Sequence, residues 1–75
     1  MILLYKMEDC PYCKKVIDAL EKKGIDYKPL DISNPTNKDE LIRMGGKEQV
    51  PFLMDIDKKI DLYESEDILE YLETI

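Results

Sequence analysis

The chain has 75 residues, enough for one domain but not for two, so we expect a single domain over residues 1–75. Its 17 acidic and 11 basic side chains give a formal net charge of −6, which argues against nucleic acid or an anionic membrane as the partner. The first apolar run covers only residues 2–5 and is followed by Lys6, so we expect neither a signal peptide nor a membrane span. These features predict a monomeric protein of the cytoplasm.

Apolar spacing and turn residues predict seven elements in the order β-α-β-α-β-β-α. Strands are expected at about residues 2–5, 26–31, 52–56 and 59–62, and helices at 11–23, 35–44 and from residue 65 onward. Pro29 cannot donate a hydrogen bond to a neighbouring strand, which predicts that the second strand lies at an edge. Ser65 is expected to cap the last helix. The order favours an α/β fold with a four-stranded mixed sheet flanked by three helices, its first two strands parallel and joined by a right-handed crossover.

The motif Cys-Pro-Tyr-Cys occupies residues 10–13, between the first strand and the first helix, and holds the only cysteines in the chain. A disulfide within it closes too short a loop to stabilise the fold much, so we interpret the pair as chemistry and not as scaffolding. Cys10 falls at the N-cap and Pro11 at the first helical position, where its missing N–H costs nothing. The free N–H groups at a helix start favour the thiolate form of a neighbouring cysteine.

Two other interpretations of the cysteine pair stay open. Zinc normally needs four ligands, and this chain has no further cysteine and no histidine, so a metal site would have to be shared between molecules. Alternatively, both thiols are buried and inert, which suits Cys13 because it shares an apolar helix face with Val16 and Leu20. That interpretation does not explain Cys10 at the helix start. We therefore favour redox chemistry and expect no metal.

With this element order, the Cys-Pro-Tyr-Cys motif, and Val50-Pro51 opening the third strand, the chain resembles a glutaredoxin of thioredoxin fold. Its carboxy-terminal half looks most like the thioredoxin-fold domain of the glutathione-transferase-like glutaredoxins, on the strength of residues 43–46, 49–51 and 63–68. Those relatives carry an additional helical domain. Since this chain stops soon after the last predicted helix, the resemblance implies the redox domain alone.

The resemblance implies a thiol–disulfide oxidoreductase in which Cys10 attacks a disulfide as thiolate and Cys13 resolves the mixed disulfide. Such a protein would reduce protein disulfides, glutathione mixed disulfides, or both. Glutathione would be a cosubstrate, and no cofactor would be tightly bound. The implied partners are glutathione or another low-molecular-weight thiol, together with disulfide-containing proteins.

The resemblance also implies a site for glutathione close to the cysteines. Pro51 would be a cis proline, and Val50 would offer its backbone N–H and C=O to an extended peptide, as an added strand does. Tyr12 is expected to expose its ring beside the Cys10 sulfur.

The two carboxylates of glutathione need partners at opposite ends of that site. The family's glutathione motif carries over onto Glu64, Ser65 and Glu66, where helix N–H groups and a hydroxyl would hold the γ-glutamyl carboxylate and an acidic side chain the ammonium. Lys47 or Arg43 is expected to pair with the glycine carboxylate. The alternatives are that Ser65 only caps the helix and that Lys47 is solvated surface.

Two further functions stay open on the sequence. Met7 stands where many small glutaredoxins have a lysine, and Tyr63-Glu64 stands where they have a pair of glycines. The first rival is therefore a thioredoxin-like dithiol reductant that is served by a flavoprotein reductase and does not use glutathione. The second is a non-enzymatic scaffold that binds a [2Fe–2S] cluster shared between two chains through Cys10 and external thiols.

Overall fold

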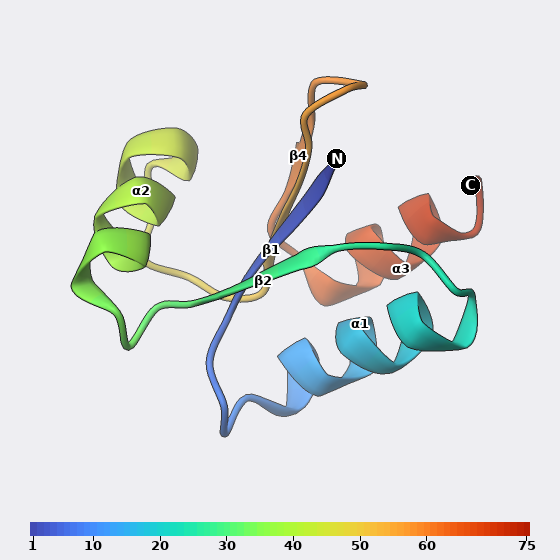
Figure 1. The fold of residues 1–75 in the computed structure, drawn as a ribbon, viewed down its shortest axis with the longest axis horizontal. Coiled ribbons are helices and arrows are strands. Elements are labelled where there is room, and N and C mark those ends of the chain that lie inside the picture. The colour runs from blue at the N-terminus through green and yellow to red at the C-terminus, as the bar shows by residue number, and fades with distance from the viewer.

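The computed structural model describes residues 1–75 and contains the seven elements in the expected order (Figure 1). They are β1 (Ile2–Lys6), α1 (Pro11–Lys22), β2 (Lys28–Asp31), α2 (Pro35–Gly45), β3 (Phe52–Asp55), β4 (Ile60–Leu62) and α3 (Ser65–Leu72). The strands form one sheet in the order β2-β1-β3-β4. β1 and β2 run parallel, whereas the other two pairs are antiparallel. The predicted mixed sheet is therefore confirmed, as is the edge position of the strand that contains Pro29.

Each face of the sheet is covered by helices because successive strand residues point to opposite sides. Leu4 points to the face that packs against α1 and α3, where it joins a core of seven buried apolar residues. Its neighbour Tyr5 points to the other face, where it packs with Phe52 and with Leu41 of α2. Figure 1 shows α1 and α3 lying next to each other, with α2 well apart from them on the other side of the sheet. This is the layered arrangement expected of the thioredoxin fold.

The helix ends follow the predicted residues with one exception. α1 begins directly after Cys10, α2 is capped by the Asn34 side chain, and Gly46 ends α2 with the positive φ of 85° that favours glycine. The expectation that Ser65 caps α3 is wrong. Ser65 is the first helical residue, Glu64 occupies the N-cap position with a ψ of 133°, and no side-chain hydrogen bond caps the helix. The free N–H groups of this helix start are therefore not taken up by a cap.

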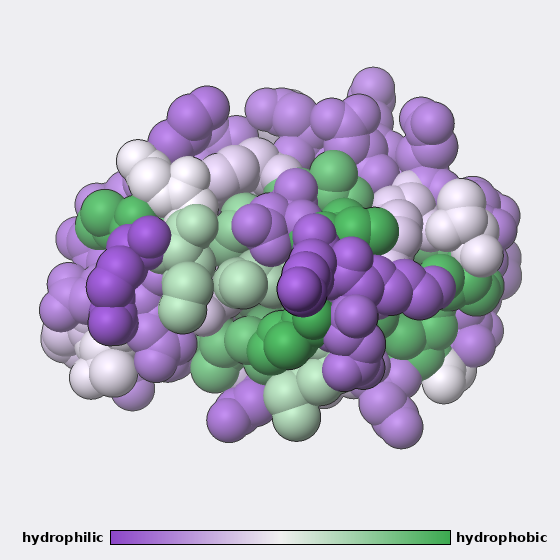
Figure 2. Space-filling model, turned by 90° about the horizontal axis from the view of Figure 1, so that it is seen from above, coloured by the Kyte–Doolittle hydropathy of each residue, from purple (hydrophilic) through white to green (hydrophobic).

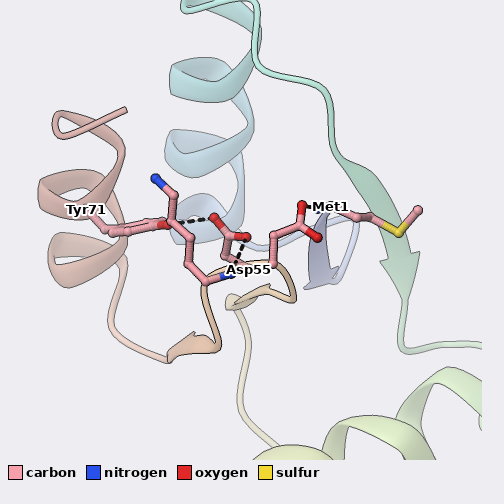
Figure 3. A network of polar contacts seen from close by, with 5 residues as sticks. Met1, Asp55 and Tyr71 are labelled. Atoms are coloured by element: carbon pink, nitrogen blue, oxygen red, sulfur yellow. Dashed lines mark hydrogen bonds and ion pairs between the residues drawn. The ribbon is translucent and has the colours of Figure 1, made fainter.

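A buried carboxylate joins the end of β3 to α3 (Figure 3). Asp55 is only 6% exposed, and the Tyr71 hydroxyl donates a hydrogen bond of 2.6 Å to its Oδ2 atom. The backbone N–H of Lys58 donates to Oδ1 at 3.4 Å, and the amino group of Met1 pairs nearby with Asp57. The Tyr71 hydroxyl holds the pKa of Asp55 below its usual value, and the carboxylate in turn raises the pKa of Tyr71 to about 12. These contacts fasten the hairpin to α3.

We expect Tyr71→Phe to lower the free energy of unfolding by about 1.5–3 kcal/mol at pH 7, because the buried carboxylate loses its strongest donor. Because the pKa of Asp55 is lower in the folded protein, the hydrogen bond contributes most to the free energy of unfolding above about pH 4. This contribution is lost as the pH falls through the pKa of Asp55 in the folded protein. Urea unfolding at pH 7 and at pH 3 tests this. A difference between wild type and variant that is the same at both pH values would contradict the ionic character of the contact.

Charged residues make up 37% of the sequence. On the face shown in Figure 2, hydrophilic residues surround several smaller hydrophobic patches. None of the three helices has the length and apolar character needed to cross a membrane.

Candidate active site

Cys10 lies between β1 and α1, in extended backbone at the N-cap of the helix. Its sulfur accepts a hydrogen bond from the backbone N–H of Cys13 at 3.1 Å, and its carbonyl accepts the first helical bond from Lys14 at 3.0 Å. Pro11 follows at the first helical position, as predicted. A negatively charged sulfur is stabilised here by both the N–H donor and the positive end of the helix.

Cys13 has a different environment, one turn further along the apolar face of α1. Its side chain is fully buried, and both cysteines are free thiols. Burial raises the pKa of the Cys13 thiol to about 12, with a further contribution from its hydrogen bond to Cys10. A hydrogen bond with the Met7 backbone opposes this shift, and the charge of Lys6 opposes it more weakly. Cys13 is therefore held in the neutral thiol form at physiological pH, whereas Cys10 is the accessible sulfur of the pair.

A pocket of about 530 Å³ opens beside this motif. Three parts of the chain line it: the residue that follows Pro11, the segment directly before β3, and the segment that leads into the first turn of α3. Its lining consists of Tyr12, Gln49, Val50, Pro51, Tyr63, Glu64, Ser65, Glu66 and Asp67. Six of these were candidates from the sequence, and the fold brings them together. The Val50–Pro51 peptide bond is cis.

The two predicted cations do not reach the pocket wall. Lys47 and Arg43 are both absent from the lining, and the Lys47 ammonium lies 5.6 Å from the centroid of the Tyr63 ring. The three charged residues that do line the pocket are all acidic, namely Glu64, Glu66 and Asp67. Pairing of a cation with the glycine carboxylate therefore stays a prediction.

Sequence reasoning did not assign three lining residues to the site. Gln49, Tyr63 and Asp67 each lie directly next to a residue that was assigned, and all three fall within the segments 49–51 and 63–68 that carry the family resemblance. In the structure the Gln49 side-chain amide donates to the Glu64 carboxylate at 3.3 Å, so it connects two walls of the pocket. This hydrogen bond between Gln49 and Glu64 thus helps to hold the two walls of the pocket together.

Comparison with known proteins agrees with this geometry. Residues 4–75 match the family described as glutathione S-transferase, N-terminal domain. The uncharacterized glutaredoxin-like 8.6 kDa protein in the rubredoxin operon of Clostridium pasteurianum is 30% identical over 60 residues, which cover 80% of each chain. This chain belongs to that domain family, among the glutaredoxins. The predicted resemblance is confirmed.

Other glutaredoxins match over part of their length. Glutaredoxin 1 of Rickettsia prowazekii is 36% identical over 53 residues, covering 67% of this chain and 56% of the relative. The chain thus spans about half the length of such curated relatives. The crystal structure of Salmonella typhimurium glutaredoxin 2 in complex with glutathione superposes with a TM-score of 0.82 at 30% identity, over 97% of this chain and 33% of that one. The thioredoxin fold expected for this glutaredoxin is confirmed.

Proposed function

We propose that this glutaredoxin is a thiol–disulfide oxidoreductase that uses glutathione as its cosubstrate. The observation that carries the proposal is the position of the Cys10 sulfur, at a helix start with an N–H donor 3.1 Å away, in a motif whose Tyr12 lines the pocket. A sulfur held in this way is suited to attack as a thiolate. Glutaredoxin relatives and a related structure that contains glutathione support the assignment.

In the proposed reaction the Cys10 thiolate attacks one sulfur of a disulfide, forms a mixed disulfide, and releases the other sulfur as a thiolate. When the mixed disulfide is with glutathione, a second glutathione thiolate attacks it, which yields glutathione disulfide and regenerates Cys10. When the mixed disulfide joins Cys10 to a protein, Cys13 loses its proton and its thiolate attacks the Cys10 sulfur. The protein then leaves with both of its thiols reduced, and a Cys10–Cys13 disulfide remains. Two glutathione molecules then reduce this disulfide.

The pocket offers each part of the γ-glutamyl end a partner. Val50 can pair with the peptide backbone as a neighbouring strand would. The α3 start, where no side chain caps the helix, has N–H groups and the Ser65 hydroxyl for the carboxylate. The Glu66 carboxylate in its first turn can bind the ammonium.

We expect Ser65→Ala and Glu66→Gln each to raise the Michaelis constant for glutathione by about tenfold, which corresponds to about 1.4 kcal/mol. The free energy of unfolding should change by less than about 0.5 kcal/mol, because neither side chain caps α3. Glu70→Gln, on the same helix but outside the pocket, is the control. Kinetics at varied glutathione together with urea unfolding measure both quantities. Wild-type Michaelis constants in both variants would refute the glutathione site.

The acidic lining of the pocket favours one second candidate. Glutathione carries two carboxylates, while the charged lining residues are Glu64, Glu66 and Asp67. A thioredoxin-like reductant served by a flavoprotein reductase needs no such carboxylate site. The reduction potential separates the two functions, because a value near −270 mV is typical of thioredoxin and one of about −200 to −230 mV of glutaredoxins.

A further inference from the structure

Tyr63 makes contacts that reach well beyond its own segment between β4 and α3. Its hydroxyl donates a hydrogen bond to the carbonyl of Lys47 at 3.0 Å and accepts one from the N–H of the same residue at 3.1 Å. Both backbone groups of Lys47 are thus held by one hydroxyl, 16 residues away in the sequence. The Lys47 ammonium also lies 5.6 Å from the centroid of the Tyr63 ring, within the range of a cation–π contact.

The ring of Tyr63 is held from two sides. On one side it contacts Phe52 of β3, with ring centroids 4.4 Å apart. At its hydroxyl end lies Gly45, the last residue of α2, where a Cβ atom would be 2.0 Å from the Tyr63 Oη atom and 2.7 Å from its Cζ atom. Real atoms do not approach this closely, so any side chain at position 45 would displace the tyrosine. Glycine is therefore required here by its neighbour and not by its own backbone conformation.

These contacts join the two walls of the pocket. The segment from Gly46 to Val50 leads from α2 to the cis bond, and its last two residues, Gln49 and Val50, line one wall of the pocket. Tyr63 begins the other wall, directly before Glu64 and Ser65. The Gln49 amide and the Glu64 carboxylate make a weaker second link of 3.3 Å between the same segments. Both links fix the distance between the backbone of Val50 and the start of α3.

We propose that Tyr63 is a positioning residue that holds the 46–50 segment against the start of α3 and so preorganises the pocket for an extended thiol peptide. We call the two hydrogen bonds between the Tyr63 hydroxyl and the Lys47 backbone the clamp. This inference rests on the proposed function, since glutathione is the ligand that would contact both the Val50 backbone and the start of α3. Without the clamp, glutathione would have to order the 46–50 segment when it binds, and this loss of conformational freedom would weaken its affinity. The chemistry at Cys10 does not depend on the clamp, because Cys10 and its N–H donor both lie on α1 and its N-cap.

The first test is Tyr63→Phe, which removes both hydrogen bonds and keeps the ring. We expect the Michaelis constant for glutathione to rise about three- to tenfold while the turnover number stays within about twofold. Reaction of Cys10 with a small aromatic disulfide that contains no glutathione should be unchanged. Native-state hydrogen exchange of the Lys47 amide should accelerate by at least about tenfold. Tyr27→Phe is the matched control, because it removes a tyrosine hydroxyl bond to Glu21 away from the pocket.

The second test uses Gly45. Gly45→Ala should displace the Tyr63 hydroxyl and reproduce the change in Michaelis constant, whereas in a Tyr63→Ala background the same substitution should add no further loss. This double-mutant cycle stays informative even if one single variant is destabilised. Additive losses in the two substitutions would overturn the coupling between these residues.

The remaining outcomes separate the clamp from the function on which it rests. An unchanged Michaelis constant and unchanged Lys47 exchange in Tyr63→Phe, with wild type active, would overturn the positioning role alone. If wild type shows no glutathione-dependent turnover, the proposed function fails. Hydrogen exchange of the Lys47 amide, which is measured without glutathione, then tests the clamp by itself. Faster exchange in Tyr63→Phe supports the clamp, and unchanged exchange overturns it.

Discussion

Replacing Cys10 with serine is expected to abolish every thiol-exchange activity of this protein, and replacing Cys13 with serine is expected to abolish only part of it. Cys10 provides the attacking sulfur in each proposed reaction, and no other accessible thiol can replace it. Removing glutathione from a mixed disulfide needs one attacking thiolate, so Cys13→Ser should keep this activity. Releasing a reduced protein dithiol needs a resolving thiol, so the same variant should lose that activity.

Two substrates tested side by side separate these roles. A glutathionylated peptide reports on the reaction that needs one thiol, and a protein with an internal disulfide reports on the reaction that needs two. We expect the rate with Cys10→Ser to fall at least about 10³-fold on both substrates, to the uncatalysed background. A Cys13→Ser variant that is inactive on the glutathionylated peptide would show that the one-thiol reaction does not occur.

The second large effect is a difference in reactivity between the two thiols. Reduced, folded protein treated with iodoacetamide at pH 7 should take up one label, at Cys10, before Cys13 reacts at all. Cys13 is fully buried, and its raised pKa keeps it in the neutral thiol form at this pH. Mass spectrometry of the intact and digested protein counts and places the labels. Protein unfolded in urea is the control and should take up two.

The same raised pKa fixes the sign of a pH effect on stability. In the unfolded chain the Cys13 thiol ionises near pH 8.5, whereas in the folded protein it does so only near 12. Its contribution to the free energy of unfolding is therefore complete below about pH 8.5 and is lost as the pH rises toward 12. In the iodoacetamide experiment, equal labelling of Cys10 and Cys13 in the folded protein would contradict the buried, neutral state of Cys13.

The sequence predicts those parts of the fold that depend on local signals. Pro11 places Cys10 at the start of a helix because proline fits only the first turn, and Pro29 marks an edge strand because it lacks a donor. The cap of α3 was misplaced by one residue. Serine is favoured both at the N-cap and just inside a helix, and only the extended backbone of Glu64 shows which position Ser65 occupies.

Contacts between distant segments could not be predicted. Nothing near Tyr63 in the sequence indicates that its hydroxyl binds the backbone of Lys47, or that Gly45 must stay small to admit it. Buried Asp55 and half-buried Tyr71 are likewise 16 residues apart. Lys47 was selected for its charge alone, and its position over an aromatic ring follows from the packing of the loop and not from any pattern in the chain.

A single-turnover reduction by glutathione tests the central proposal most directly. The oxidised protein, with its Cys10–Cys13 disulfide, is mixed with excess glutathione and quenched with acid at successive times, and the species are separated by mass. We expect a transient species with one glutathione bound through Cys10, followed by the free dithiol and glutathione disulfide. Complete reduction by dithiothreitol combined with no reduction by glutathione would contradict the proposal and leave the reductase-linked function in its place.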